Sequence, residues 1–213
     1  MDGTMMLELS GVVPLATVDD DAAADVIADG LVAGGLPVLE VALRNPHGMA
    51  AIERIAARGD VLVGAGTVLD REQLRQALDV GAAFVVAPGL DEEIVEAALT
   101  AGVPVLPGVI TPSDIQRGIR LGLERLKLFP AGAAGGLALV NALAPVFPGV
   151  RFMPSGGVST ANLGEYLAHP AVFAASGSWI AAPARIAAGA EAVAEAAREA
   201  VAVRAEAGLR AGR

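Results

Sequence analysis

We predict that this chain folds as a single α/β domain, a (β/α)8 TIM barrel, and three observations lead to that prediction. Short apolar runs rich in β-forming residues alternate with alanine-rich stretches that have helical periodicity. The apolar runs start 20 to 26 residues apart, and no change of composition marks a linker. Eight such units in 213 residues match a barrel near the lower size limit of that fold. A doubly wound open sheet has the same local pattern and stays open as an alternative.

The predicted strands are apolar along nearly their whole length. This is typical of parallel strands that are covered by helices, because neither face of such a strand meets water. The predicted strands cover residues 12–16, 38–42, 61–65, 84–87, 104–106, 125–129, 151–153 and 172–175.

The predicted helices are bounded by residues that suit helix ends. Glycines that can adopt a left-handed backbone follow several of them, namely Gly34, Gly35, Gly81, Gly102 and Gly122. Residues suited to the N-cap precede others, namely Asp70, Asp91, Thr111 and Ser159. The helical stretches cover residues 21–32, 71–78, 92–99, 112–121, 137–143 and 161–167, and we expect a frayed helical tail from residue 204 to 213.

Composition excludes several classes of function. The 15 Lys and Arg residues stand against 24 Asp and Glu, a net charge of -9 that argues against nucleic acid or an anionic membrane as a partner. With no cysteine, the chain has no disulfide, thiol catalyst or Cys-ligated metal. No Lys or Arg precedes Arg44, so no signal-peptide pattern is present and we expect a cytoplasmic protein.

One basic residue differs from all the others, since Lys127 is the only lysine among 14 arginines. It lies inside an apolar predicted strand. Arginine keeps its proton at any working pH, whereas a desolvated lysine can become a free amine that attacks a carbonyl carbon. The alternative is a lysine whose stem packs in the core while its charged head reaches solvent.

Glu40 is a carboxylate inside another apolar strand, where it is costly unless it is paired or used. With a period of two, Glu40 and Arg44 share a face if the strand extends that far. They form either a structural ion pair or a functional set, in which Glu40 is a general acid and base and Arg44 binds a substrate carboxylate.

Two glycine-bearing segments follow the last two predicted strands, Ser155-Gly156-Gly157 and Ser176-Gly177-Ser178. Loops after strands 7 and 8 are the usual phosphate site of this barrel, because backbone N–H groups and helix N-termini face the anion there. We therefore expect a phosphate-bearing ligand at these loops. Thr67, after the third predicted strand, offers a hydroxyl group at the same end.

Several segments in order along the chain resemble the class I 2-dehydro-3-deoxy-6-phosphogluconate (KDPG) and 4-hydroxy-2-oxoglutarate (KHG) aldolase family. The resemblance extends from about residue 12 to residue 203. The segments are GLPVLEVALR at 35–44, VGAGTVL at 63–69, APGL at 87–90, KLFPA at 127–131, PSGGVS at 154–159 and GSW at 177–179.

The resemblance implies a lyase: a homotrimeric Schiff-base aldolase that needs no metal and no cofactor. It implies that Lys127 forms the carbinolamine and the imine with the C2 carbonyl of a phosphorylated 2-keto acid, and that Glu40 moves the protons. The products would be pyruvate and glyceraldehyde 3-phosphate, or pyruvate and glyoxylate from KHG. The implied substrate-binding residues are Arg44 and Thr67 for the carboxylate, Pro88 and Phe129 for the pocket wall, and Ser155, Gly156, Gly157 and Ser178 for the phosphate.

Three positions depart from the common pattern of that family. Asn45 and Ser155 stand where threonine is common, and Gly132 stands where glutamate is common, so substrate preference and loop geometry are the least determined properties. Two other functions stay open from the residues alone. One is a non-covalent phosphosugar isomerase or epimerase with Glu40 as base; the other is a non-catalytic phosphate-binding barrel in which Lys127 is a counter-ion.

Overall fold

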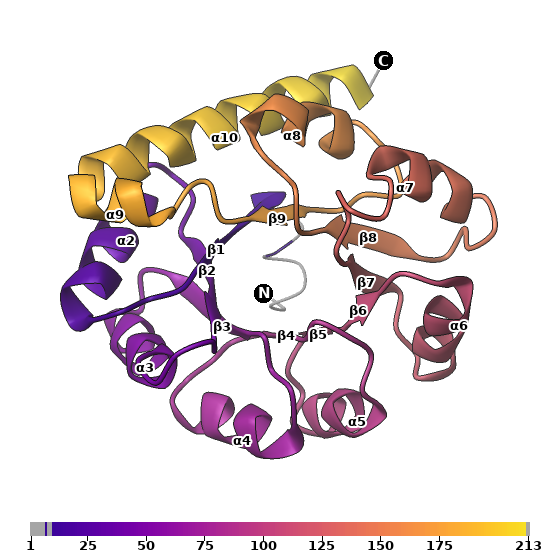
Figure 1. The fold of residues 1–213 in the computed structure, drawn as a ribbon, viewed down its shortest axis with the longest axis horizontal. Coiled ribbons are helices and arrows are strands. Elements are labelled where there is room, and N and C mark those ends of the chain that lie inside the picture. The colour runs from indigo at the N-terminus through magenta and orange to yellow at the C-terminus, as the bar shows by residue number, and fades with distance from the viewer. Residues whose placement is uncertain (1–6, 8–9, 212–213) are drawn as a thin grey trace.

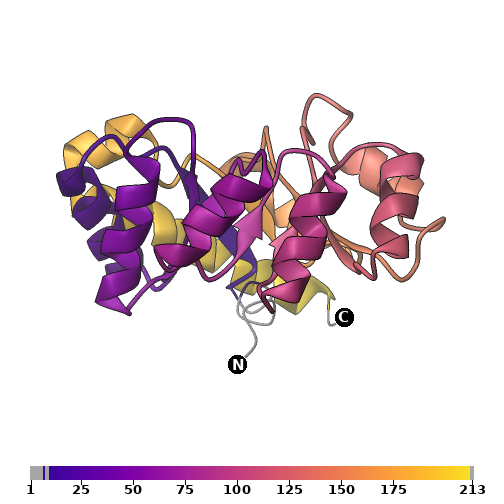
Figure 2. The ribbon, with the colours of Figure 1, turned by 90° about the horizontal axis from the view of Figure 1, so that it is seen from below.

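The computed structural model describes residue 7 and residues 10–211, and in it parallel strands surround the centre of the molecule while helices form the outer layer (Figure 1). Seen from the side, the outer helices stand next to one another along the strands (Figure 2). Buried apolar side chains extend from the strands to the inner faces of the helices. The architecture is therefore an α/β fold with a curled parallel sheet, as in TIM-like proteins.

The strands form two parallel sheets. One has the order β5-β4-β3-β2-β1-β9 and the other the order β6-β7-β8. Only Pro107 separates β5 from β6, and isolated bridges join Phe152 to Val172 and Ser155 to Ser176 between the β8 and β9 segments. The strands are β1 (Val12–Ala16), β2 (Val38–Ala42), β3 (Leu62–Gly66), β4 (Val85–Val86), β5 (Val105–Leu106), β6 (Gly108–Val109), β7 (Arg125–Leu128), β8 (Arg151–Pro154) and β9 (Ala175–Gly177).

The predicted strands all overlap observed ones, and β1 and β2 have the predicted bounds. The strand predicted at residues 172–175 overlaps β9 only at Ala175, because β9 covers Ala175–Gly177. The strand β6 was not predicted. It is two residues long and contains Gly108, and Pro107 before it lacks the N–H that would continue the ladder of β5.

The predicted helices are all present within one or two residues, and α3, α9 and α10 are additional. The predicted N-caps are also confirmed: Asp70 and Asp91 accept hydrogen bonds from the backbone N–H three residues later. The helices are α2 (Asp21–Ala33), α3 (Gly48–Arg58), α4 (Arg71–Asp79), α5 (Glu92–Thr100), α6 (Pro112–Arg120), α7 (Leu137–Leu143), α8 (Thr160–Leu167), α9 (Pro183–Ala188) and α10 (Ala190–Ala211).

The chain end is helical as predicted, because the helix α10 continues to Ala211. Residues 212–213 lie outside the described part, and the fraying of this tail stays a prediction. Arg204 donates a hydrogen bond of 2.8 Å from Nη1 to the backbone oxygen of Ser10. Small residues let α10 pack closely on α2, since a Cβ at Gly30 would lie 2.6 Å from Val193 Cβ. This packing holds the first half of α10 against α2.

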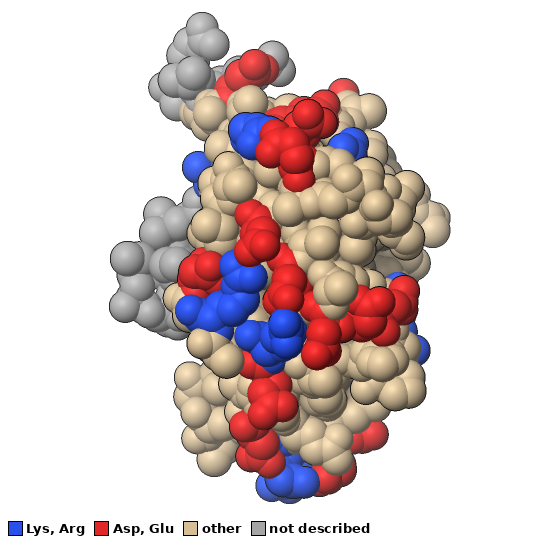
Figure 3. All heavy atoms as spheres, turned by 90° about the vertical axis from the view of Figure 1, so that its left-hand side faces the viewer, with Lys and Arg blue, Asp and Glu red and all other residues tan. Residues whose placement is uncertain are grey.

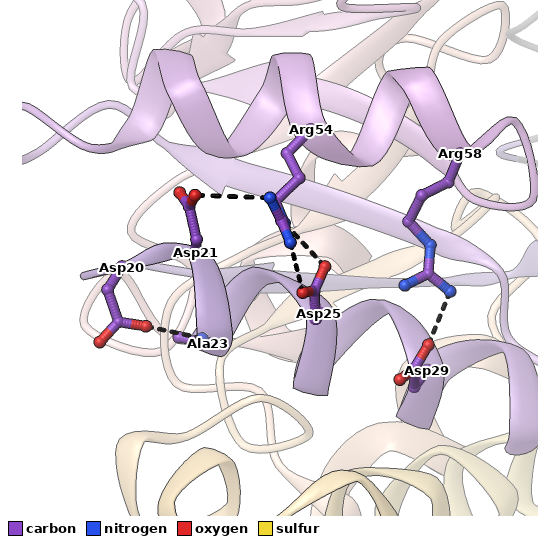
Figure 4. Close-up of polar contacts among 7 residues, drawn as sticks. All are labelled: Asp20, Asp21, Ala23, Asp25, Asp29, Arg54 and Arg58. Atoms are coloured by element: carbon purple, nitrogen blue, oxygen red, sulfur yellow. Dashed lines mark hydrogen bonds and ion pairs between the residues drawn. The ribbon is translucent and has the colours of Figure 1, made fainter.

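Ion pairs join the outer faces of α2 and α3. Arg54 binds Asp25 through two hydrogen bonds of 2.8 and 2.6 Å, and Arg58 binds Asp29 at 2.7 Å (Figure 4). The hydrogen bond from Arg54 lowers the pKa of Asp25 below its ordinary value. On this side of the molecule the arginines are interleaved with acidic side chains (Figure 3). Arg54 and Arg58 therefore form surface ion pairs between two neighbouring helices.

None of the helices in the described part of the chain has the length and apolar character that crossing a membrane requires.

Candidate active site

Lys127 lies in the second half of β7, next to Gly108 of β6 and Met153 of β8. Successive side chains of a strand point to opposite faces, so Lys127 points away from the face of its fully buried neighbours Leu126 and Leu128. Its side chain is only 5% exposed. The interpretation in which the charged head reaches solvent is therefore wrong.

The ammonium group of Lys127 meets the carboxylate of Glu40. Glu40 lies in the middle of β2, is fully buried, and its Oε1 is 3.3 Å from Lys127 Nζ. The two residues are 87 positions apart and come from different sheets. The structure thus joins the two side chains that the sequence singled out as chemically costly inside apolar strands.

Phe129 follows Lys127 by two residues and lies on the same side, as the strand parity predicts. The Nζ atom of Lys127 is 5.1 Å from the centroid of the Phe129 ring. The face of an aromatic ring carries partial negative charge, so it stabilises a cation above it. The ring of Phe129 therefore forms part of the wall beside the nitrogen of Lys127.

A third polar side chain, which the sequence reasoning did not select, completes the surroundings of Glu40. Ser176 in β9 is fully buried and donates a hydrogen bond of 3.2 Å from Oγ to Glu40 Oε2. The sequence analysis considered its segment only for phosphate binding. The signal that it missed was the position of Ser176 inside an apolar run, where its hydroxyl needs a partner, as Glu40 does.

Gly66 provides the space that the Glu40 carboxylate occupies. A Cβ atom at this position would overlap Glu40 Oε1 and would lie 2.6 Å from Cγ and 2.9 Å from Cδ. Gly66 is the register partner of Ala42 in β2, two residues beyond Glu40. A residue with any side chain at position 66 would therefore displace the carboxylate.

Arg44 and Thr67 lie together after the ends of β2 and β3. Arg44 Nε donates a hydrogen bond of 3.3 Å to Thr67 Oγ1. Thr67 has φ of 60°, a left-handed conformation that a β-branched residue rarely adopts. Since Glu40 accepts its hydrogen bonds from Lys127 and Ser176, the structural Glu40–Arg44 pair is not formed. Arg44 keeps an exposed guanidinium group beside a hydroxyl, a suitable pair for a carboxylate.

The two glycine-bearing loops lie side by side. Ser155 is buried and is bridged to Ser176, while Ser178 is exposed. Gly156 and Gly157 have φ of 83° and 86°, values that only glycine adopts easily. The loops thus bring two hydroxyl-bearing residues and two glycines with a left-handed backbone to one end of the strands. Pro88 lies half-buried in the loop after β4.

Two of the departing residues have a local explanation. Gly132 donates a backbone hydrogen bond of 2.8 Å to Gly156 O, and a Cβ there would lie 3.2 Å from Gly157 Cα, so the missing side chain lets these loops approach. Asn45 donates to Val18 O and to Asp19 Oδ1, each at 2.9 Å. It therefore fastens the loop after β1 to the loop that carries Arg44.

Comparisons with known proteins show similar sequences over most of the chain. The family model described as KDPG and KHG aldolase matches residues 4–196. The chain is 45% identical over 168 residues to a 2-dehydro-3-deoxy-phosphogluconate aldolase of Pseudomonas aeruginosa, covering 78% of this chain and 76% of that one. It is 42% identical over 174 residues to the KHG/KDPG aldolase of Escherichia coli, covering 81% and 82%.

Solved structures are similar along nearly the whole chain. A Zymomonas mobilis 2-keto-3-deoxy-6-phosphogluconate aldolase with 3-phosphoglycerate has a TM-score of 0.88 at 39% identity, covering 94% of this chain and 95% of that one. A Legionella pneumophila KDPG aldolase has a TM-score of 0.88 at 35% identity, covering 93% and 97%. In the latter, pyruvate is captured as a covalent carbinolamine intermediate.

Proposed function

This chain belongs to the KDPG and KHG aldolase family and is an aldolase, and we propose that it cleaves 2-dehydro-3-deoxy-6-phosphogluconate to pyruvate and glyceraldehyde 3-phosphate through a Schiff base on Lys127. The observation that carries the proposal is the buried contact of 3.3 Å between Lys127 Nζ and Glu40 Oε1. The covalent carbinolamine in the Legionella relative supports the same chemistry.

Glu40 and Lys127 divide the work of forming the imine. Glu40 takes a proton from the ammonium group of Lys127, and the neutral amine then adds to C2 of the keto acid. The protonated Glu40 gives that proton to the hydroxyl group, which leaves as water. The resulting iminium nitrogen carries positive charge beside the Phe129 ring, which stabilises it. Burial of the pair keeps bulk water away from these steps.

Cleavage then uses the same carboxylate as a base. Glu40 removes the proton of the C4 hydroxyl, the C3–C4 bond breaks, and its electron pair moves toward the iminium to leave an enamine and the aldehyde. The protonated Glu40 returns a proton to C3 of the enamine. Hydrolysis of the imine frees pyruvate and restores the amine of Lys127.

The remaining predicted residues bind the two ends of the substrate. We assign the pyruvyl carboxylate to Arg44 and Thr67, which already contact each other. We assign the distal phosphate to the loops that contain Ser155, Gly156–Gly157 and Ser178, and the pocket wall to Pro88 and Phe129. A guanidinium group at one end and backbone N–H groups at the other let an acidic protein hold an anionic substrate.

We also propose that the two sheets close into one (β/α)8 barrel forming a single domain, and that the active molecule is a homotrimer. The single residue between β5 and β6 and the bridge from Ser155 to Ser176 support closure, because they connect the sheets at both sides. Sedimentation analysis of the purified protein tests the trimer.

Reductive trapping tests the function. Pyruvate and borohydride should add one reduced pyruvyl group to the intact chain, at Lys127, since the chain has one lysine. The variants Lys127→Ala and Lys127→Arg should lose both the adduct and the cleavage of the phosphorylated substrate, and wild-type activity should persist with a chelator. Wild-type protein without an adduct would refute the covalent mechanism. Comparison of KDPG with KHG as substrates measures the preference.

A further inference from the structure

The two oxygen atoms of Glu40 have different partners. Oε1 faces Lys127 Nζ at 3.3 Å, where the proton transfers of the proposed mechanism take place. Oε2 accepts a hydrogen bond of 3.2 Å from the hydroxyl of Ser176. Glu40 and Ser176 are both completely buried, so bulk water cannot take the place of the Ser176 hydroxyl as donor to Oε2.

The orientation of a carboxylate is not determined by its own side chain, because the last torsion of glutamate is broad. On one side of the carboxylate, Gly66 has no side chain, so it leaves space for Glu40 but offers no hydrogen bond that would orient it. On the other side Ser176 is held by parallel pairing with Val13 of β1 and by the bridge to Ser155. The backbone of Ser176 is therefore fixed by strand pairing, and its hydroxyl donates to a carboxylate whose last torsion its own side chain leaves undetermined.

We infer that Ser176 is a positioning residue of this aldolase, whose hydroxyl holds Glu40 Oε2 so that Oε1 stays directed at Lys127 and at the substrate carbons. The inference rests on the proposed function of Glu40 and adds a residue to it. Ser176 itself transfers no proton to substrate in this scheme. It keeps the carboxylate in one orientation while Glu40 alternates between acid and base.

Two substitutions of Ser176 distinguish the loss of the hydrogen-bond donor to Glu40 from the loss of the serine side chain as such. Ser176→Ala removes the hydroxyl and leaves a gap too small for water, so Oε2 loses its donor. Ser176→Gly leaves more room, near the roughly 30 Å³ that one water molecule takes up, and a water there can donate to Oε2. We therefore expect kcat to fall in the order wild type, Ser176→Gly, Ser176→Ala, with a loss of about tenfold in the alanine variant.

Three further readouts distinguish positioning from general damage. In Ser176→Ala the KM should stay within about twofold of wild type, because the substrate-binding residues are untouched. The exchange of the pyruvate methyl protons in D2O should fall in proportion to kcat, since it needs the same carboxylate. The borohydride adduct at Lys127 should still form. Thr100→Val, which removes an exposed hydroxyl bonded to Glu96 O in α5, should leave all values unchanged.

The outcomes are distinguishable. Wild-type kcat and methyl exchange in Ser176→Ala, with the wild-type adduct present, would overturn the inference and leave the proposed function intact. A loss of kcat in Ser176→Gly equal to or greater than that in Ser176→Ala would also overturn it. If the alanine variant does not fold, Ser176→Cys replaces it, because a thiol fills the place but is a weak donor. An unchanged kcat in that variant would overturn the inference as well.

Discussion

Gly66 makes the geometry of the proposed catalytic pair, Glu40 and Lys127, sensitive to a single methyl group. In Gly66→Ala the new Cβ would lie 2.6 Å from Glu40 Cγ, whereas ordinary contact begins at 3.4 Å, so the carboxylate must retreat by about 0.8 Å. The distance between Glu40 Oε1 and Lys127 Nζ is already 3.3 Å. If the carboxylate moves directly away from Lys127, this distance grows to about 4 Å, which is too long for a hydrogen bond.

A displacement of this size has a large kinetic effect. Misplacing a catalytic group by about 1 Å costs on the order of a hundredfold in rate, which corresponds to about 2.7 kcal/mol in the activation free energy. We expect kcat for cleavage of the phosphorylated substrate to fall by about that factor in Gly66→Ala. Gly66 itself is not assigned to substrate binding, so the loss should fall mainly on kcat and less on KM.

The assay couples pyruvate production to lactate dehydrogenase and follows the oxidation of NADH. Thermal unfolding of each variant shows whether the protein is folded at the assay temperature. Gly149→Ala is the matched control, because a Cβ at Gly149 meets no atom within 4 Å. Wild-type kcat in folded Gly66→Ala would refute the argument.

Three other predictions concern stability. Thr67→Gly relieves the left-handed φ of 60° and should raise the free energy of unfolding by about 1 kcal/mol, which urea titration measures. Its KM should rise in steady-state kinetics, because Arg44 loses its hydroxyl partner. An unchanged KM would contradict the role of Thr67. The hydrogen bond from Arg75 lowers the pKa of Glu72 to about 2 from its ordinary 4.5, so this carboxylate stabilises the fold above pH 4.5 and loses that effect as the pH falls toward 2. Urea midpoints at pH 6 and pH 2.5 should therefore differ less in Glu72→Gln than in wild type, and equal differences would contradict the pairing. In Gly108→Ala the methyl would overlap the backbone carbonyl of Pro88 in the loop after β4, and a backbone carbonyl cannot rotate away. The free energy of unfolding should therefore fall by about 1–3 kcal/mol, which thermal unfolding measures. A wild-type melting temperature would contradict this contact.

Local sequence signals predicted most of the secondary structure for physical reasons that act over a few residues. Asp70 and Asp91 cap helices because their short carboxylates reach the N–H group three residues on. Gly102 and Gly122 end helices with φ of 69° and 80°, as their lack of a side chain allows. The strand β6 escaped prediction because its two residues show no periodicity and its identity depends on pairing with β7.

The candidate site was predictable in part. Lys127 and Glu40 were conspicuous because a charged group inside an apolar strand is costly, wherever the strand lies in the fold. Phe129 could be placed on the side of Lys127 from strand parity alone. Ser176 gave a weaker signal, because a serine next to a glycine is typical of any turn. Its importance depends on Glu40, which is 136 residues away along the chain.

The sequence by itself determined the alternation of strands and helices, the family resemblance, and the identity of the one lysine to which we assign the role of nucleophile. Only the tertiary structure decided that Lys127 meets Glu40, that Ser176 holds the second oxygen of Glu40, and that Gly66 leaves the space for it. The physical reason is that the period of a strand states which side chains share a face but not which strands become neighbours. That choice is made when the strands pair in register, and contacts across 87 and 136 residues then follow from it.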